Sequence, residues 1–103
     1  MAHPQLLILD EPCNGLDLFA REELLKRVGK IAEMPNRPAL LLVSHYTEEL
    51  LPCFNNVLLL RQGHIIQKGK RADVLNEESL THFYQKPIQT VTITGNRLAV
   101  YPK

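Results

Sequence analysis

The sequence predicts an α/β fold built around parallel strands, and three segments support that prediction. Continuous apolar runs at residues 6–9 and 39–43 are typical of strands that are buried on both faces of a sheet. Between them lies a segment whose apolar residues recur at the spacing of an amphipathic helix. A strand, a helix and a second strand in this order predict a right-handed βαβ unit, so strands at residues 5–10 and 39–44 are expected to be parallel neighbours.

The first strand leads into an acidic turn and then into the helix. Asp10, Glu11 and Pro12 follow the apolar run, and the proline disfavours a longer central strand because it lacks a backbone N–H. Asp17 is a good N-cap residue for the helix. The helix is expected to run for about four turns and to end near Pro35. Its apolar face is predicted to consist of Leu24, Leu25, Val28, Ile31 and Ala32.

Smaller elements are predicted after the second strand, which ends at Ser44 and His45. Thr47 is expected to cap a short helix whose first turn is acidic. The pair Gln62-Gly63 lies between two apolar runs and is typical of a tight hairpin turn. Residues 72–84 have the composition of one or two short helices.

The tail of the chain has a different pattern. Residues 89–94 alternate between apolar and polar side chains, so Val91 and Ile93 are expected on one face and the threonines on the other. Gly95-Asn96 then predicts a turn into a last strand. The tail is therefore expected to be an antiparallel hairpin with one face in water.

Composition and charge exclude several classes of protein. The chain has 103 residues, and its 12 basic and 11 acidic side chains leave a net charge of +1 with 45% hydrophobic residues. That balance excludes a disordered tail and gives no support for a polybasic nucleic-acid arm. No apolar run approaches the ~18 to 20 residues of a membrane span. Cys13 and Cys53 have no paired spacing and are interpreted as reduced thiols.

The strongest chemical signal is the pair of acids that follows the first strand. Ligands of open α/β sheets bind beyond the carboxyl ends of the strands, which is where Asp10 and Glu11 stand. Side chains alternate along a strand, so neighbouring acids can serve different purposes. One carboxylate can hold Mg²⁺ while the next polarises a nucleophilic water. The alternative is a strand that simply runs into an acidic turn.

The motifs around these acids occur in a specific order. Leu6 to Glu11 is followed by Asn14-Gly15-Leu16-Asp17, then by Val43-Ser44-His45 after the second strand, and then by the strand pair at residues 56–69. This ordered set resembles the C-terminal portion of the nucleotide-binding domain of ABC transporter ATPases, from the Walker B strand onward. Residues 2–5 are similar to the end of the helix that precedes Walker B in that family, so the resemblance covers residues 1–76.

The resemblance implies a role for each site residue. Asp10 would hold Mg²⁺, directly or through water, as Walker B aspartates do, and Glu11 would be the catalytic glutamate that orients or deprotonates the attacking water. His45 would be the switch histidine that hydrogen-bonds the γ-phosphate. Asn14 and Asp17 would belong to the D-loop, at the interface of two nucleotide-binding domains. Asn14 and the cysteine before it depart from the Thr-Ser pair that is commoner in the family.

The same resemblance implies the architecture, the ligands and the partners. It predicts a partial P-loop NTPase of the ABC type, with a parallel sheet, flanking helices and C-terminal β-hairpins. Residues 1–76 would form part of the nucleotide-binding domain, and residues 77–103 an accessory helix and hairpin tail. ATP and Mg²⁺ are the implied cofactors, and a second nucleotide-binding domain and a transmembrane permease are the implied partners, with no nucleic acid expected. The implied location is the cytoplasm, at the inner face of the plasma membrane when a permease is bound.

Motifs that precede Walker B in the family do not occur in the sequence. There is no G-x-x-x-x-G-K-[ST] phosphate loop, no glutamine loop and no LSGGQ-type signature. We therefore expect a fragment whose longer parent hydrolyses ATP, while the chain alone is inactive and has an apolar sheet edge that favours association. A soluble ABC-type ATPase of DNA repair or translation is one alternative, and a non-catalytic remnant or interaction module is another.

Overall fold

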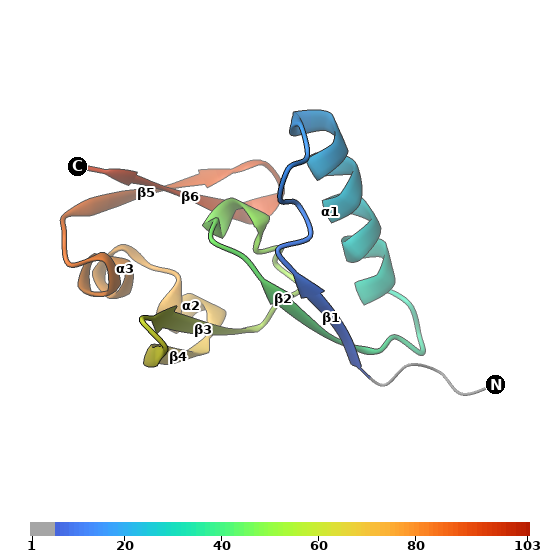
Figure 1. The fold of residues 1–103 in the computed structure, drawn as a ribbon, viewed down its shortest axis with the longest axis horizontal. Coiled ribbons are helices and arrows are strands. Elements are labelled where there is room, and N and C mark those ends of the chain that lie inside the picture. Colours follow the sequence, from blue (N-terminus) through green and yellow to red (C-terminus); the bar gives the residue numbers. More distant parts are fainter. Residues whose placement is uncertain (1–5) are drawn as a thin grey trace.

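The computed structural model describes residues 6–103 and confirms the predicted α/β unit. Strands β1 (Leu6–Asp10) and β2 (Ala39–Val43) pair in parallel and in the register Leu6 to Ala39 through Asp10 to Val43. Helix α1 (Leu18–Ala32) connects the two strands (Figure 1). The predicted strand start at residue 5 and the family resemblance of residues 2–5 lie outside the described residues.

Helix α1 begins and packs as its sequence predicts. Oδ1 of Asp17 accepts a hydrogen bond from the backbone N–H of Ala20 at 2.8 Å, which satisfies one of the free donors at the helix start. Leu25 and Val28 are each only 2% exposed, so the predicted apolar face is the buried one. Within residues 6–103 no helix has the length and apolar character that crossing a membrane requires.

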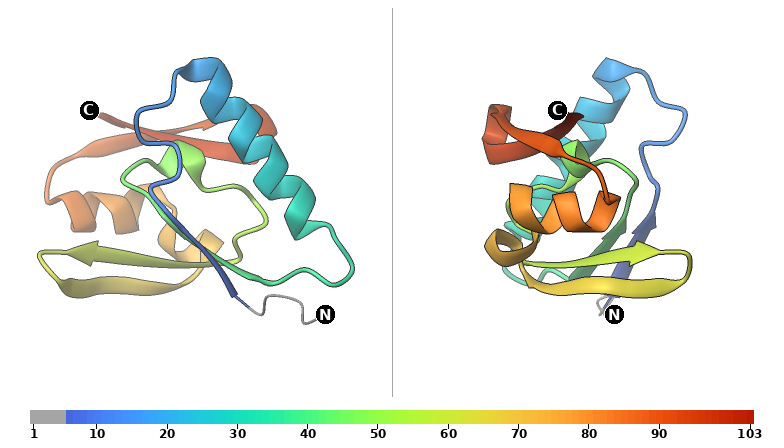
Figure 2. Two further views of the ribbon diagram at one scale, coloured as in Figure 1. Left: turned by 45° about the vertical axis from the view of Figure 1, so that its right-hand side comes forward. Right: turned by 90° about the vertical axis from the view of Figure 1, so that its left-hand side faces the viewer.

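Two antiparallel hairpins and short helices make up the rest of the described chain. Figures 1 and 2 place helix α3 between the β3–β4 hairpin and the β5–β6 hairpin in every view. The elements after β2 are η1 (Thr47–Glu49), β3 (Asn56–Arg61), β4 (His64–Lys70), α2 (Arg71–Val74), α3 (Glu77–Tyr84), β5 (Ile88–Ile93), η2 (Thr94–Asn96) and β6 (Arg97–Pro102). The predicted turn at residues 62–63 and the predicted pair of short helices are both confirmed.

The main hydrophobic cluster lies where α3 meets the two hairpins. Val74 and Leu80 have no exposed surface, and Leu59 and Ile88 are also buried. These side chains come from α2, α3, β3 and β5, so one cluster joins all four elements. Burial of a leucine of this kind contributes about 1.5–3 kcal/mol to folding.

The prediction that Thr47 caps a helix is wrong. The segment is the short 3₁₀ helix η1, Thr47 lies inside it, and Tyr46 occupies the cap position without a side-chain cap. The reason is that Ser44, not Thr47, provides the side-chain hydrogen bond here. Its hydroxyl oxygen accepts a hydrogen bond from the backbone N–H of Tyr46 at 3.0 Å.

The tail is the predicted antiparallel hairpin. The apolar face of the alternating segment would be expected to be the buried one, but Val91 on that face is exposed. Val91 is 46% exposed, whereas Ile88 on the other face of β5 is buried. Leu98 and Val100 of β6 stand opposite threonines of β5 and pack against the hydrophobic cluster. Packing against α3 therefore selects the face, and the alternation within β5 alone does not.

One face of the β1–β2 pair is apolar and exposed. Leu6, Ile8, Leu41 and Val43 are 54, 57, 48 and 43% exposed. Ile8 stands opposite Leu41, so these side chains share one face of the sheet. Among residues 6–103 no third strand pairs with this sheet, and an apolar face of this kind favours self-association.

We expect the isolated 103-residue chain to form oligomers through this face. Replacing both Ile8 and Leu41 with threonine places β-branched, strand-compatible side chains at both positions but removes apolar area, so the dissociation constant is expected to rise at least about tenfold. Leu60→Thr is the control, because Leu60 is 55% exposed on β3. Sedimentation velocity measures the change, and a chain that is monomeric at all concentrations before substitution contradicts the prediction.

Candidate functional site

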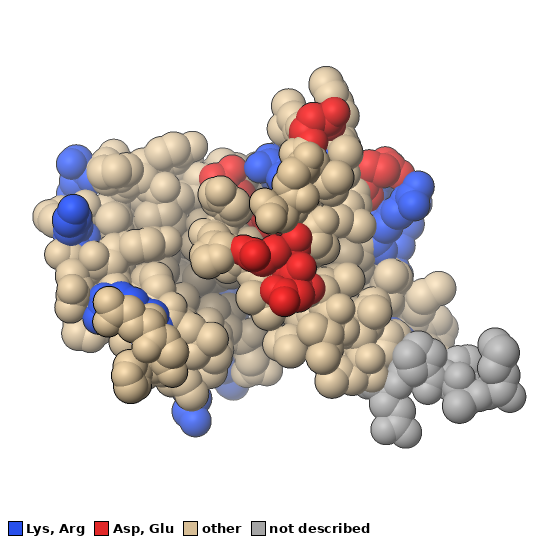
Figure 3. Space-filling model, in the orientation of Figure 1, with Lys and Arg blue, Asp and Glu red and all other residues tan. Residues whose placement is uncertain are grey.

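The structure brings Glu11 and His45 into direct contact. Nε2 of His45 lies 2.7 Å from Oε1 of Glu11. Glu11 directly follows β1, and His45 lies two residues after β2, so the two side chains meet at the carboxyl ends of neighbouring parallel strands. Figure 3 shows acidic side chains gathered over this end of β1.

The backbone of Glu11 has an unusual conformation for a side chain of its kind. Its φ is +47°, which lies in the left-handed region where a non-glycine residue costs about 1–3 kcal/mol. The N–H of Glu11 donates to the carbonyl of Val43 at 2.8 Å, so the strand ladder continues to this residue and fixes it. The chain therefore stores strain at the position that directs Glu11 towards His45.

The contact between Glu11 and His45 is exposed. The side chain of His45 is 80% exposed and that of Glu11 is 39% exposed. Exposed side-chain contacts of this kind contribute at most about 1 kcal/mol, because water competes for both groups and the side chains lose freedom. The two groups can consequently separate at little cost when a water or an anionic group enters between them.

Ser44 and Glu49 hold the segment that carries His45, although neither residue is among the predicted site residues. The Ser44 hydroxyl donates to Oε1 of Glu49 at 2.7 Å and accepts the N–H of Tyr46 at 3.0 Å. Glu49 is only 5% exposed, and carboxylates are rarely buried to this extent unless they have a partner such as this hydroxyl. The signal that could have revealed this pair is a serine at a strand end with a glutamate five positions after it.

Of the other site residues predicted from sequence, the structure brings only Asn14 to the same place. A hollow of about 250 Å³ is lined by Glu11, His45, Asn14 and neighbouring residues of both loops. Asp10 and Asp17 are exposed and do not line it. Asp17 instead uses one carboxylate oxygen to cap α1.

The carboxylate of Asp10 is suited to Mg²⁺. Mg²⁺ is generally held by one or two carboxylates, with waters and substrate phosphates completing its octahedral shell. Asp10 provides one such oxygen donor at the end of β1 and remains accessible. Residues 6–103 contain no cluster of three or more His, Cys, Asp or Glu that could hold a metal ion, and waters and substrate phosphates would supply further oxygen ligands.

A charged network adjoins this hollow. Arg97 of β6 is 7% exposed and forms a bidentate pair with Glu22 of α1, at 2.9 and 3.1 Å. Arg21 contacts Glu22 at 3.1 Å and reaches Glu48 of η1 at 3.9 Å. The hydrogen bond from Arg97 is the main reason that the pKa of Glu22 is lower than usual.

Cys13 lies buried beside this network. It is 5% exposed, burial raises the pKa of its thiol, and the carboxylate of Glu49 raises that pKa further. A thiol with a raised pKa is almost fully protonated at neutral pH and reacts slowly. Cys13 and Cys53 are both free, as the spacing of the cysteines predicted.

The lowered pKa of Glu22 makes folding stability depend on acidity. Above the ordinary glutamate pKa of about 4.3 the pair stabilises the folded chain fully, and this contribution is lost as the pH falls through the lower folded value. We therefore expect the loss of stability between about pH 5 and pH 3 to be smaller in the double variant Glu22→Gln/Arg97→Gln than in the wild type. Urea unfolding at each pH measures the free energy of unfolding of both proteins.

The control for this pH dependence is Glu23→Gln. Glu23 forms a pair with Arg27 at 3.5 Å, in which both side chains are largely exposed. An exposed pair of this kind contributes little, so the pH profile is expected to stay that of the wild type. A double variant at residues 22 and 97 with the wild-type profile contradicts the prediction.

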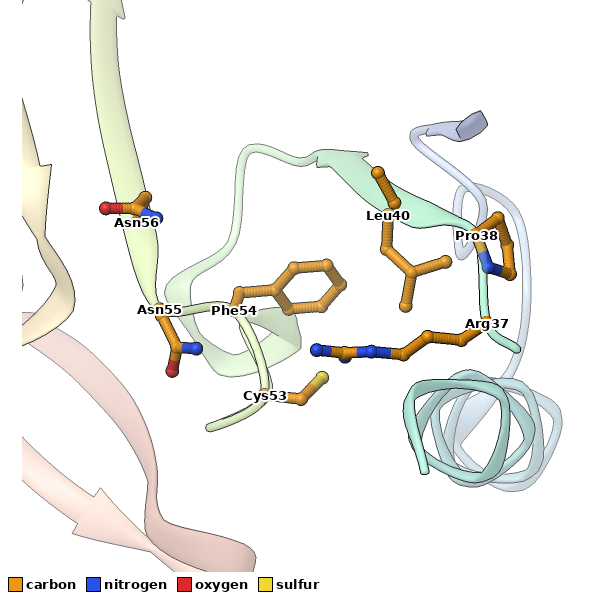
Figure 4. A pocket seen from close by; sticks show the side chains of 8 residues that line it. Arg37, Pro38, Leu40, Cys53, Phe54, Asn55 and Asn56 are labelled. Carbon is orange, nitrogen blue, oxygen red and sulfur yellow. The ribbon is translucent and has the colours of Figure 1, made fainter. Parts of the chain in front are cut away.

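A second hollow, of about 370 Å³, is larger but lacks catalytic groups. It lies between residues 37–40 and 53–56, at the start of β2, whereas His45 follows the end of that strand. Figure 4 shows Leu40 and Phe54 pointing into it and the Arg37 side chain extending towards Cys53. No carboxylate lines this hollow. The carboxylate and imidazole at the ends of β1 and β2 are therefore better evidence for the functional site than the larger volume of this second hollow.

Comparisons with known proteins show which proteins the chain resembles. No protein-family model matches the sequence. A Streptococcus mutans protein named as an ABC transporter ATP-binding protein is 41% identical over 103 residues, which are 100% of this chain and 40% of that protein. The ABC transporter ATP-binding protein YmeB of Lactococcus lactis is 49% identical over 84% of this chain and 33% of its own length. YlmA of Bacillus subtilis, which carries the same description, is 45% identical over 88% of this chain and 34% of its own length.

A solved structure has the same fold. A protein described as a metal-chelate type ABC transporter in an inward-facing conformation superposes with a TM-score of 0.74 and 24% identity. The match covers 96% of this chain and 40% of the other. The chain thus spans 33 to 40% of the curated relatives named above, and its α/β arrangement is a partial P-loop NTPase fold of the kind found in that transporter.

Proposed function

This chain is homologous to part of the ABC transporter ATP-binding proteins, and on that premise we propose that it supplies the catalytic-carboxylate portion of an ATP-hydrolysing transporter subunit. The single observation that carries the proposal is the 2.7 Å contact between Glu11 and His45 at the ends of two parallel strands. A carboxylate and an imidazole at hydrogen-bond distance are suited to orient a water and accept its proton.

Each site residue has a defined task in this proposal. Asp10 holds Mg²⁺, directly or through water, and bound Mg²⁺ supplies positive charge next to the phosphates of ATP. Glu11 accepts a hydrogen bond from the attacking water and orients it towards the γ-phosphate. His45 donates a hydrogen bond to a γ-phosphate oxygen, which is possible because its contact with Glu11 is exposed and opens easily.

The proposal also assigns partners. Asn14 and Asp17 face a second nucleotide-binding domain, and this is supported by three exposed apolar residues around Asp17, namely Leu16, Leu18 and Phe19, of which Phe19 is 83% exposed. A transmembrane permease is the second partner, so the subunit works in the cytoplasm at the inner face of the plasma membrane. Within the chain, residues 1–76 contribute to the nucleotide-binding domain and residues 77–103 are an accessory element.

A chimera tests this function. Residues 1–103 replace the matching segment of the Streptococcus mutans relative, whose similarity extends over the whole chain. We expect Mg²⁺-dependent release of phosphate from ATP, and we expect His45→Ala to reduce the rate without weakening ATP binding by more than a few-fold. His64→Ala is the matched control, because His64 is exposed in the β3–β4 hairpin, away from the site.

The chimera also distinguishes this function from a non-catalytic module. A folded chimera that binds ATP but does not hydrolyse it contradicts the proposal and favours a non-catalytic module. The names of the relatives favour a transporter subunit over a soluble ATPase of DNA repair or translation. The isolated chain has no phosphate loop and is expected to bind a fluorescent ATP analogue more weakly than the micromolar range.

A further inference from the structure

The C-terminal hairpin contacts both segments that carry the proposed site. Strand β6 packs against η1, which begins two residues after His45. The same strand reaches α1 through the bidentate pair between Arg97 and Glu22, at 2.9 and 3.1 Å. Helix α1 begins directly after Asp17. The hairpin therefore touches the element after each of the two loops.

Side chains extend this connection into a continuous network. Glu22 is shared by Arg97 and Arg21, and Arg21 also reaches Glu48 of η1 at 3.9 Å. The network thus joins β6, α1 and η1. Next to Glu48, the buried Glu49 accepts the Ser44 hydroxyl at 2.7 Å, and Ser44 directly precedes His45.

The burial of Arg97 makes this contact specific. Its side chain is 8% exposed, and its Nε is buried without a hydrogen-bond partner among residues 6–103. Glu22 is consequently the group that compensates the guanidinium charge. Arg97 is the buried member of this pair, since 37% of the Glu22 side chain is exposed, and the bidentate geometry holds α1 and β6 in one relative position.

The opposite face of the hairpin is attached separately. Leu98 and Val100 pack against the hydrophobic cluster around Leu80, and Lys103 pairs with Glu77 of α3 at 2.9 Å. The hairpin therefore has its own anchor on α3 and β3. Its Arg97 face is free to act on α1 and η1 without also being the main support of the hairpin.

We propose that the C-terminal hairpin is a brace that sets the positions of the loop at residues 11–17 and of the segment that carries His45, and that Arg97 is its positioning residue. The identity of what is positioned rests on the function proposed above. The brace acts through α1 on one loop and through η1 on the other. Arg97 touches neither the nucleotide nor the attacking water.

Cys13 provides a direct readout of the brace in the 103-residue chain. It lies within residues 11–17, it is 5% exposed, and in a Cys53→Ser background it is the single thiol. The rate of its reaction with dithiobisnitrobenzoate reports how often this loop opens. We expect Arg97→Gln to raise the rate at least tenfold in the absence of urea, and Arg97→Lys to raise it less, because lysine keeps the charge but loses the bidentate geometry.

Leu98→Ala is the matched control for general loosening of the hairpin. It removes apolar contact on the other face of the same strand and leaves the pair with Glu22 intact. If Leu98→Ala raises the Cys13 rate as much as Arg97→Gln does, the effect is loss of stability and the proposal is overturned. Urea unfolding of each variant measures the loss of stability with which its Cys13 rate is compared. If Arg97→Gln does not fold, Arg97→Lys replaces it in this comparison.

Charge reversal and catalysis complete the test. The double variant Glu22→Arg/Arg97→Glu is expected to bring the Cys13 rate back to within about threefold of the wild type. In the chimera, Arg97→Gln is expected to lower kcat at least fivefold with KM for ATP unchanged, and the charge reversal to restore kcat. An unchanged Cys13 rate in Arg97→Gln overturns the brace, whereas an inactive chimera with a raised Cys13 rate contradicts the ATPase function alone.

Discussion

Glu11→Gln in the chimera is expected to lower ATP turnover by about 10²- to 10⁴-fold, the range that one general base provides. Glutamine has nearly the same shape, but it cannot accept a proton from the attacking water. It still reaches His45, since the left-handed backbone at this position is fixed by the 2.8 Å bond from the N–H of Glu11 to Val43. ATP affinity is expected to remain within a few-fold of the wild type.

Single-turnover phosphate release and equilibrium binding of ATP measure the two quantities separately. Glu33→Gln is the matched control, because it makes the same chemical change on an exposed side chain at the far end of α1. Turnover that survives Glu11→Gln removes this residue from the role of base. The contact between Glu11 and His45 then no longer supports the proposed function.

Leu80→Ala is expected to destabilise the chain by about 2–5 kcal/mol. Leu80 has no exposed surface, and it lies on α3 between Leu59 of β3 and Ile88 of β5 within the same cluster. Truncation leaves a cavity at the point that joins both hairpins, and neighbouring backbones cannot collapse fully into it. A chain of this size has little stability in reserve, so the loss approaches its whole free energy of unfolding.

Urea unfolding followed by circular dichroism measures this effect, with the oligomeric state held constant by the Ile8→Thr/Leu41→Thr background. Leu60→Ala is the control, since Leu60 is adjacent to the buried Leu59 in β3 but is 55% exposed. Its expected change is within about 0.5 kcal/mol, as for other surface positions. If Leu80→Ala and Leu60→Ala lower the free energy of unfolding equally, the core is not centred on α3 and the prediction is contradicted.

The sequence predicts the βαβ unit well because the relevant signals are local. Apolar runs, the spacing of Leu25 and Val28, and the cap at Asp17 each act within a few residues of where they occur. The faces of the tail hairpin are not predicted in this way. Which side of β5 is buried depends on α3, so the alternation of Val91 with its neighbours carries no information about it.

The candidate site follows the same division. The contact of Glu11 with His45 is predictable, because the carboxyl ends of adjacent parallel strands open on the same side. The roles of Glu49 and Arg97 are not predictable, because each depends on a partner that only the folded chain brings near. Glu22 and Arg97 are 75 positions apart, and nothing in either local sequence indicates the other.

That separation also has a consequence for the order in which the chain acquires its structure. Synthesis proceeds from the N-terminus, so α1 leaves the ribosome before Arg97, the distant partner of Glu22, has been added. Closing a contact over 75 residues also carries an entropy cost, which the packing of α3 and the two hairpins helps to offset. The contact that joins α1 to β6 can therefore form only after almost the whole of the 103-residue chain has been synthesised.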